Sequence, residues 1–347
     1  MPSDSLVKPH ELTTHRLSNL HGLQMEVTNL GGKIMSLKVL DKEGKLTDVV
    51  LGYDEAADYL RGNPFFGALI GPYGNRIARG RFTLEDKDYT LPANHEDHVL
   101  HSGKEGFHNV LWKIRPVDSA AGEALELSYL SRDGACGFPG TLQVKVTYTL
   151  TAQNALSIHY EAQTDKTTLV NLTHHSFFNL AGEGSGDILG HRLTIFGDYF
   201  TPVTHGLIPT GEIRRVFDTP FDFTQPRLIG ERIEQAEEQL RLGRGYDHNW
   251  VLNKSAGSLS RAALVEAPAS GLKMEVWTTE PGLQFYSGNF LDGSDLGKGQ
   301  KKYTYRSAFC LEAQHFPDSP HHPHFPTTVL HPGQTYRQHT LYRFLTP

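Results

Sequence analysis

The stretch GTLQVKVTYTLTAQNALSIHYEAQT, residues 140–164, alternates apolar and polar side chains with a period of two. Successive side chains of a strand point to opposite sides of a sheet, so this period is typical of a β-strand with one buried face. The polar residues Gln153 and Asn154 interrupt the alternation, which then resumes. The stretch therefore predicts a β-hairpin. The side chains expected to face the core are Leu142, Val144, Val146, Tyr148, Leu150, Leu156, Ile158 and Tyr160.

Other parts of the chain repeat this pattern. Further strands are expected at residues 22–40, 123–130, 271–279 and 283–291. Short helices are expected at residues 54–60 and 231–241, the second with too few apolar positions for a core helix. Many strands, dispersed turn residues and no alternation of strands with helices predict an all-β fold, a large antiparallel β-sandwich or barrel. We expect residues 1–347 to form a single domain.

Composition narrows the classes of function. Of 347 residues, 38% are hydrophobic and 21% charged, as in an ordinary globular protein. A net charge of -6 and a pI of about 6.3 favour neither nucleic acid nor a membrane surface as a partner. No apolar run approaches the roughly 20 residues that span a bilayer. Cys136 and Cys310 are too few for a disulfide framework and their pairing stays open, so a cytoplasmic location is the simplest expectation.

Two adjacent histidines, His174 and His175, lie in the apolar stretch VNLTHHSFFNL, residues 170–180. In a strand, only one of the two can face a given side. His175 shares its side with polar residues such as Asn171, whereas His174 shares its side with apolar residues such as Leu172. We therefore expect His175 to face a polar ligand and His174 to be structural. The alternative is that both are buried structural histidines.

A single carboxylate, Glu312, stands in the apolar stretch SAFCLEAQHF, residues 307–316. The alternation places Glu312 on one side of the predicted strand with Cys310 and Gln314. A carboxylate in so apolar a strand costs free energy unless it is paired or used, which makes Glu312 a candidate catalytic residue. The alternative is an edge-strand charge that faces water.

Four further stretches combine polar groups with turn residues, as sites carried by loops often do. They are GPYGNRIARGRF (71–82), HVLHSGKEGF (98–107), GYDHNWVL (245–252) and PGLQFYSGNF (281–290). They offer the candidates Asn75, Arg76, His101, Asp247 and Gln284. Plain alternatives exist: Arg76 could belong to a solvated basic face, Asp247 could form a turn, and His101 could cap one.

The nineteen histidines raise the question of a metal site, above all the cluster HHPH at residues 321–324. Proline interrupts that cluster, and the sequence has no histidine or cysteine spacing typical of zinc. We expect no bound metal.

Taken together, these stretches resemble the aldose 1-epimerase (galactose mutarotase) family. GNRI, NLTHHSFFNL, YDHNW, PGLQFYSGNFL and LEAQHFPDSP occur in the family's order and cover the chain from about residue 20 to its end. The resemblance implies a galactose mutarotase-like supersandwich, which is one large antiparallel β-sandwich with a few short helices. It implies an isomerase that interconverts the α and β anomers of free hexoses such as galactose and glucose. It further implies no metal or organic cofactor, a small-molecule sugar as partner, and a monomer or homodimer.

The resemblance also implies roles for single residues. Glu312 matches the family's general base, and His175 matches its general acid. The family's sugar-binding positions correspond to Asn75, Arg76, His101, Asp247 and Gln284. Ring opening removes a proton from the C1 hydroxyl and delivers one to the ring oxygen, which an ionised glutamate and a charged histidine can do. Tyr73 and Phe178 are candidates for contact with the apolar surface of the sugar.

The chain departs from the family pattern at three places. His174 stands where asparagine is common, LHSG replaces LHGG at residues 100–103, and HHPH replaces a more amide-rich stretch. The hydroxyl of Ser102 could alter sugar preference. Two alternatives stay open: a hexose-6-phosphate 1-epimerase that binds phosphate through Arg76, Arg79 and Arg81, and a non-catalytic sugar-binding module of the same fold.

Overall fold

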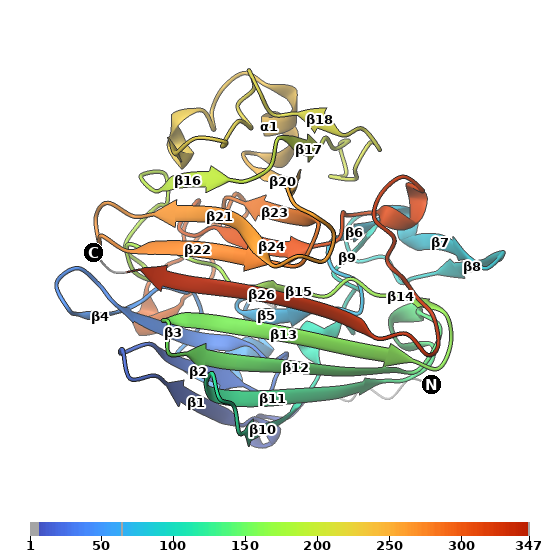
Figure 1. The fold of residues 1–347 in the computed structure, drawn as a ribbon, viewed down its shortest axis with the longest axis horizontal. Helices are drawn as coiled ribbons and strands as arrows, with labels where there is room; N and C mark the ends of the chain where they lie inside the picture. The colour runs from blue at the N-terminus through green and yellow to red at the C-terminus, as the bar shows by residue number, and fades with distance from the viewer. Residues whose placement is uncertain (1–6, 64, 346–347) are drawn as a thin grey trace.

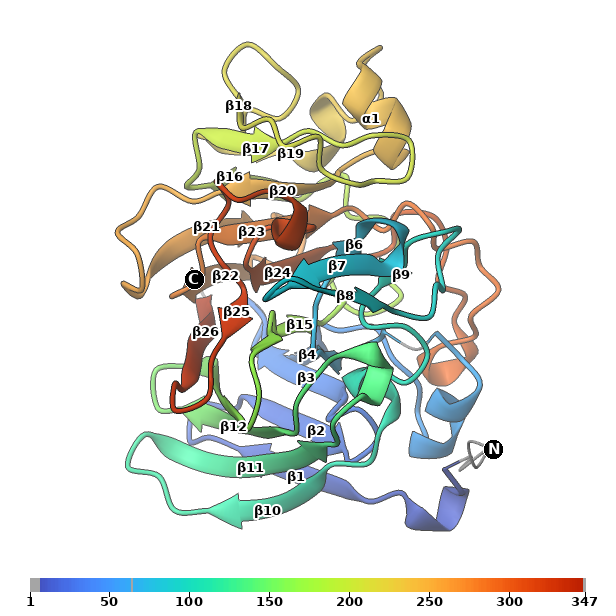
Figure 2. The same ribbon diagram turned by 90° about the vertical axis from the view of Figure 1, so that its right-hand side faces the viewer.

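The computed structural model describes residues 7–63 and 65–345. Its strands form two layers: a nine-stranded antiparallel sheet faces the viewer in Figure 1, and shorter sheets lie behind it (Figures 1 and 2). Within the described residues, helix is confined to one short α-helix and several single 3-10 turns. The predicted all-β sandwich with few helices is confirmed.

The nine-stranded sheet forms the first layer. In spatial order its strands are β10 (Lys113–Val117), β11 (Gly122–Ser131), β12 (Leu142–Thr151), β13 (Ala155–Thr164), β26 (Tyr336–Leu345), β22 (Lys273–Thr278), β21 (Ser260–Glu266), β16 (Arg192–Ile195) and β19 (Arg227–Leu228). The hairpin predicted at residues 140–164 is β12 and β13, with Leu150 opposite Leu156. Asn154 makes its turn at a φ of 55°, a conformation that asparagine tolerates. All eight side chains expected to face the core are buried, so this prediction is confirmed.

The second layer consists of short sheets that continue one another. One sheet contains β1 (Thr14–Ser18), β2 (Gln24–Thr28), β3 (Ile34–Leu40) and β4 (Leu46–Asp48). Another contains β18 (Arg214–Arg215), β17 (Tyr199–Thr201), β20 (Asp247–Val251), β23 (Gly282–Tyr286) and β24 (Cys310–Gln314). Between them, β15 (Thr173–His175) pairs with β5 (Ala68–Ile70) and lies beside β24. Phe178 bridges to Val50 on one side and to Phe309 on the other, which joins the two sheets.

Smaller elements complete the fold. The remaining strand pairs are β6 (Arg76–Ile77) with β9 (Val99–Leu100), β7 (Arg81–Leu84) with β8 (Lys87–Thr90), and β14 (Thr168–Leu169) with β25 (Val329–Leu330). Single 3-10 turns lie at Pro9–Glu11, Ala56–Leu60, Ala78–Gly80, Phe107–Asn109, Ala135–Gly137, Ile229–Glu231, Lys298–Gln300 and Ser319–His321. The helix expected at residues 54–60 is therefore a 3-10 turn.

The helix expected at residues 231–241 is wrong over its first half. A 3-10 turn ends at Glu231, and the α-helix α1 spans only Glu238–Gly243. The carboxylate of Glu237 accepts a hydrogen bond from the backbone N–H of Leu240 at 3.1 Å, and this cap fixes where the helix begins. Polar spacing in the sequence could not reveal that cap.

One hydrophobic core lies between the two layers. It contains Tyr148 and Ile158 from the nine-stranded sheet and Phe178, Phe285 and Leu311 from the second layer, all at most 1% exposed. Burying each such side chain contributes about 1.5–3 kcal/mol. Because the apolar sides of β15, β23 and β24 face this core, their other side chains point to the opposite face of the layer.

Two further observations bear on the composition. Cys136 and Cys310 are both free and buried. Among the described residues, the helices are too short or too polar to cross a membrane.

Candidate active site

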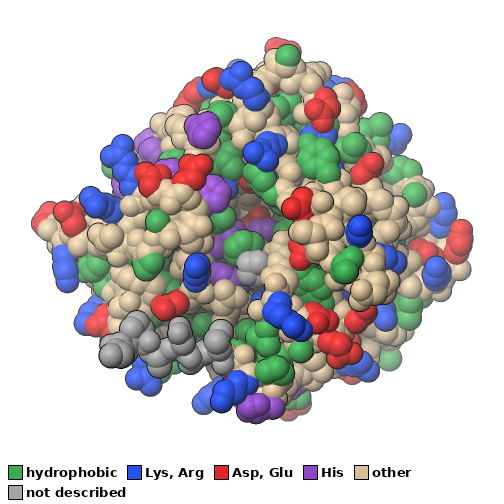
Figure 3. All heavy atoms as spheres, turned by 180° about the vertical axis from the view of Figure 1, so that it is seen from behind, with side chains coloured by type: hydrophobic (Ala, Val, Ile, Leu, Met, Phe, Trp, Pro, Cys, Tyr) green, Lys and Arg blue, Asp and Glu red, His purple; other side chains and the backbone are tan. Residues whose placement is uncertain are grey.

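A cavity of about 310 Å³ opens in the second layer. Seen from behind, the molecule has a hollow where histidine, acidic and apolar side chains meet (Figure 3). Six of the seven predicted site residues line the cavity: Asn75, Arg76, His101, His175, Asp247 and Glu312. Gln284 does not line it. The other lining residues are Asn63, Phe65, His95, Leu100, Phe177, Tyr286, Phe290, Leu291 and Asp295.

Glu312 and His175 face each other in this cavity. Glu312 lies on β24 and His175 on β15, and the side-by-side packing of these strands brings Nε2 of His175 within 3.6 Å of Oε1 of Glu312. Both residues are buried, with 2% and 6% of their surface exposed. The carboxylate is on an edge strand of its sheet, yet it does not face water, because β15 covers it. Oε2 of Glu312 and Nδ1 of His175 have no hydrogen-bond partner among the described residues.

Two phenyl rings stack on the ring of His175. Phe177 stacks on it at 4.9 Å and Phe65 at 5.6 Å between ring centroids, each inclined by 18°. The two phenyl rings exclude water and fix the ring plane, and their faces attract a positive charge on the imidazole. Phe177 shares the strand side of His175, so the alternation that selected His175 could also have selected Phe177. No comparable signal marks Phe65.

The two candidates for aromatic contact with a sugar, Tyr73 and Phe178, lie elsewhere. Tyr73 is in a separate apolar cluster, where its ring stacks near Phe138. Phe178 belongs to the main core. Strand direction explains the second case, because Phe178 points to the opposite side from His175. Both predictions are therefore corrected in favour of Phe65, Phe177, Tyr286 and Phe290.

Burial shifts both members of the Glu312–His175 pair toward their uncharged forms. It raises the pKa of Glu312 well above its ordinary value, and Asp247 nearby adds to this rise. It lowers the pKa of His175 to about 3. A proton that moves from Glu312 to His175 creates opposite charges 3.6 Å apart, and their attraction opposes the cost of burial. The neutral pair and the ion pair therefore differ less in free energy than either shift alone implies.

Backbone contacts lock His101 and Asn75 together. The N–H of His101 donates to the carbonyl oxygen of Asn75 at 3.0 Å, and the N–H of Asn75 donates to Nδ1 of His101 at 3.1 Å. Since Nδ1 accepts a hydrogen bond and burial lowers the pKa of His101 well below its ordinary value, the neutral ring carries its proton on Nε2. The side-chain oxygen of Asn75 accepts from the N–H of Arg76 at 2.9 Å, which leaves its amide N–H groups as donors.

Ser102 ties the two loops that carry these residues. Its buried hydroxyl accepts a hydrogen bond from the N–H of Tyr73 at 2.8 Å and donates one to the carbonyl oxygen of Tyr73 at 3.0 Å. The single hydroxyl proton is therefore already used within the protein. Ser102 has a φ of 64°, and Asn75 and His101 also have positive φ, so three residues of these two loops occupy the left-handed region.

Arg76, Asp247 and Gln284 form one connected wall. Nη2 of Arg76 lies 3.8 Å from Oδ2 of Asp247, and the amide of Gln284 donates to Oδ1 of Asp247 at 2.7 Å. Burial raises the pKa of Asp247, an effect that Arg76 and Gln284 oppose. Gln284 thus supports Asp247 from behind the cavity surface. Arg79 and Arg81 are exposed, whereas Arg76 is buried, so the three arginines do not form one basic face.

Neither the neighbouring histidine nor the histidine cluster joins the cavity. His174 lies 5.8 Å from the ring of Tyr148 in an edge contact. In the cluster at residues 321–324, Nδ1 of His321 pairs with Asp318 at 2.6 Å, and Nε2 of His324 contacts the carbonyl oxygen of Gly211. These rings therefore serve the loops around them.

One group of cavity residues could be considered as metal ligands. His101, His175 and Glu312 each offer one ligand atom, and these atoms lie within 4.8 Å of one another. His101 does not suit this role, because Nδ1 already accepts the N–H of Asn75 and Nε2 carries the proton. The donor set fits hydrogen bonding to hydroxyl groups better than it fits a metal ion.

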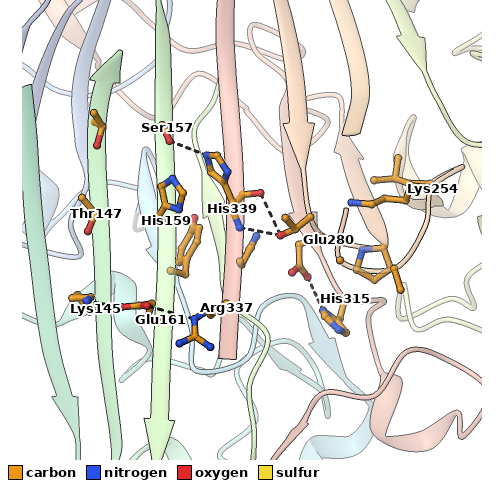
Figure 4. A pocket seen from close by; sticks show the side chains of 18 of the residues that line it. Lys145, Thr147, Ser157, His159, Glu161, Lys254, Glu280, His315, Arg337 and His339 are labelled. Carbon is orange, nitrogen blue, oxygen red and sulfur yellow. Dashed lines mark hydrogen bonds and ion pairs between the residues drawn. The ribbon is translucent and has the colours of Figure 1, made fainter. Parts of the chain in front are cut away.

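A larger groove of about 1260 Å³ lies on the outer face of the nine-stranded sheet (Figure 4). Several of its polar groups are paired with one another: Ser157 with His339 at 2.9 Å, and Glu280 with His315 at 2.6 Å (Figure 4). His159 stacks on His339 across the strands. The groove offers no pair of an unpartnered acid and base comparable to Glu312 and His175, so we place the active site in the smaller cavity.

Comparisons with known proteins show which family the chain resembles. The family model described as aldose 1-epimerase matches residues 13–343. The chain is 44% identical to galactose mutarotase of Rattus norvegicus, over 93% of this chain and 91% of that protein. It is 36% identical to aldose 1-epimerase of Escherichia coli (strain K12), over 97% and 96% of the two chains. The solved structure of a GalM/aldose epimerase homologue from C. elegans superposes with a TM-score of 0.88 at 30% identity, covering 96% of this chain and 99% of that chain.

Proposed function

The chain belongs to the aldose 1-epimerase family, and we propose that Glu312 and His175 are the residues with which this isomerase interconverts the α and β anomers of free hexoses. The single observation that carries the proposal is the buried contact of 3.6 Å between the two side chains, each with an unpartnered ring or carboxylate atom among the described residues. Glu312 acts as the general base and His175 as the general acid.

Ring opening starts from the ion-pair form of the two residues. Glu312 takes the proton of the C1 hydroxyl while His175 gives a proton to the ring oxygen, so the C1–O bond to the ring breaks and an aldehyde forms. The pair is then neutral, which is the form that burial favours. After rotation about the C1–C2 bond, the same proton transfers run in reverse and close the ring on the other face. The raised pKa of Glu312 and the lowered pKa of His175 therefore suit a reaction that uses the ion pair and the neutral pair in each cycle.

The remaining polar lining residues hold the sugar while only C1 and the ring oxygen react. Asn75 and the Nε2–H group of His101 donate hydrogen bonds to sugar oxygens. Arg76 donates and Asp247 accepts, so this pair can bind neighbouring hydroxyl groups. Gln284 orients Asp247, which makes it a supporting residue rather than a direct ligand.

Cavity charge favours free hexoses over the first alternative, hexose 6-phosphates. Among the described lining residues, Arg76 is the sole lysine or arginine, and Asp247 already pairs with it. A phosphate needs several uncommitted cations. The second alternative, a non-catalytic sugar-binding module, is disfavoured because Glu312 and His175 are both present and in contact.

Three broader expectations remain proposals. We propose that residues 1–347 form one domain, which the core shared by both layers supports. We propose a cytoplasmic monomer or homodimer, and the two free, buried thiols support the cytoplasmic location. We also propose that the partner is a small-molecule sugar rather than nucleic acid or a membrane, and the net charge of -6 supports this.

Polarimetry tests the catalytic pair. Freshly dissolved α-D-galactose and α-D-glucose are followed with the wild type, Glu312→Gln and His175→Asn. We expect the wild type to speed the decay of optical rotation and each variant to lose about 10²–10⁴-fold of that acceleration. The comparison of the two sugars ranks them as substrates.

A matched control is available at the adjacent histidine. His174→Asn changes the same side-chain type one position away, but on the opposite side of β15. It should keep most of the activity. If His175→Asn and His174→Asn lose activity equally while both stay folded, or if the wild type leaves both decays at the spontaneous rate, the assignment is wrong.

A further inference from the structure

One lining carboxylate, Asp295, has no role in the proposed function. Asp295 lies in the loop that follows β23, and it is half-buried, whereas Glu312 and His175 are buried. Phe290, another lining residue of this loop, is 47% exposed. The greater exposure of these residues places Asp295 toward the mouth of the cavity.

A small hydrogen-bond network holds Asp295 at this position. Its Oδ1 accepts the hydroxyl of buried Tyr53 and the N–H of Asn63, the latter at 3.2 Å. The N–H of Asn63 also reaches the Tyr53 hydroxyl at 2.7 Å, and the side chain of Asn63 accepts the N–H of Phe65 at 3.0 Å. Phe65 stacks on His175. The carboxylate is therefore anchored to the loop that forms one wall of the catalytic cavity.

The charge of Asp295 is not neutralised by its neighbours. Within residues 7–63 and 65–345, no lysine, arginine or histidine lies within 4.0 Å of this carboxylate. Among the described lining residues, Arg76 is the sole lysine or arginine, and it is paired with Asp247. Its neutral partners Tyr53 and Asn63 leave the negative charge in place. A sugar that enters the cavity therefore meets an uncompensated negative charge near the mouth.

We propose that Asp295 is a specificity-determining residue that weakens the binding of anionic sugars and so gives this enzyme a preference for neutral or cationic hexoses. The inference rests on the proposed function, because it assigns the substrate class of that same cavity. Asp295 lines the same cavity of about 310 Å³ as Glu312 and His175, so a negative group on a bound hexose lies in the electrostatic field of this carboxylate. At separations of about 8 Å, repulsion in a partly buried site changes binding by roughly 5- to 30-fold. Electrostatic repulsion of this kind is screened by salt.

The test compares two pairs of hexoses, and in each pair one member carries a negative group at C6. We would measure the acceleration of mutarotation for galactose and galacturonate and for glucose and glucose 6-phosphate, and the inhibition of galactose mutarotation by both anions. The wild type should prefer the neutral sugar of each pair, and raising the ionic strength should narrow this preference. Asp295→Asn keeps Oδ1 for Tyr53 and Asn63 but removes the charge, so it should narrow the preference roughly 5- to 30-fold at low salt.

Asp292→Asn provides the control for a charge change in the same loop. Asp292 is exposed, does not line the cavity, and bonds to the N–H of Ser294. It should leave the preference and the galactose activity unchanged. The inference is overturned if Asp295→Asn keeps the wild-type preference, if Asp292→Asn shifts it equally, or if salt has no effect on the wild type. Wild-type activity on galactose with equal activity on galacturonate would refute this inference alone, whereas no activity on either neutral sugar would refute the proposed function.

Discussion

Ser102→Ala should destabilise the protein and weaken sugar binding without touching a lining residue. The substitution removes the buried hydroxyl that accepts the N–H of Tyr73 at 2.8 Å and donates to its carbonyl oxygen at 3.0 Å. Both backbone groups then lie in a buried region without their partner. An unsatisfied buried polar group costs about 1–3 kcal/mol, so we expect a loss of about 2–4 kcal/mol in the free energy of unfolding.

The backbone at this position makes a second substitution informative. Ser102 has a φ of 64°, which costs roughly 1–2 kcal/mol for a residue with a side chain and little for glycine. Ser102→Gly also loses the hydroxyl but gains relief from this strain. It should therefore be less destabilised than Ser102→Ala by about 1 kcal/mol.

Thermal unfolding and steady-state kinetics measure these effects. Unfolding entropy of about 2.1 cal/mol/K per residue gives roughly 0.7 kcal/mol/K for 347 residues, so a loss of 3 kcal/mol lowers Tm by about 4 °C. Because the released loop carries Asn75 and Arg76, KM for galactose should rise more than kcat falls. A Tm within 1 °C of the wild type with unchanged KM would refute the role of the hydroxyl. A lower Tm for Ser102→Gly than for Ser102→Ala would refute the argument from backbone strain.

Three further predictions concern charge and packing. Burial raises the pKa of Glu312 and lowers the pKa of His175 to about 3, so the pair holds one proton over a wide pH range. A pair with ordinary pKa values would hold one proton only from about pH 4.5 to 6.5, so kcat/KM of this enzyme should stay level below and above those limits. A narrow bell-shaped profile between them, after subtraction of the spontaneous rate, would contradict the prediction. Lys33 is fully buried, and its ammonium group has no hydrogen-bond partner among the described residues. Burial lowers the pKa of Lys33 to about 7, so Lys33→Met should raise the free energy of unfolding by about 3–5 kcal/mol at pH 7. The stability gained by Lys33→Met should shrink as the pH rises toward 10.5, because the lysine of the unfolded chain then also loses its proton. Denaturant titrations that give the same stability gain at pH 7 and pH 10 would rule out the buried charge as its cause. Phe177→Leu removes one ring stacked on His175 and should lower kcat about 3- to 30-fold. Phe178→Leu, on the opposite side of the same segment, should lower Tm and leave kcat of the folded protein unchanged. Polarimetry and a thermal melt of each variant distinguish the two effects.

The sequence alone determined the strands and the sides to which their residues point. The alternation in residues 140–164 predicted the central hairpin and its buried side chains, because a period of two is a local property of strand geometry. The same argument separates His175 from His174, because adjacent side chains of a strand point to opposite sides. The helix predicted at residues 231–241 was wrong over its first half, because a cap at Glu237 begins the helix late.

Only the tertiary structure decided which strand sides, and which side chains on them, lie next to one another. The packing of β15 beside β24 brings His175 to 3.6 Å from Glu312, and no local pattern encodes that distance. Loop geometry placed Phe65 against His175 and Asp295 beside Tyr53, and strand pairing placed Gln284 behind Asp247. A residue's side of a strand follows from its own neighbours in the chain, whereas its partner across a cavity depends on the register and closure of segments far apart in sequence.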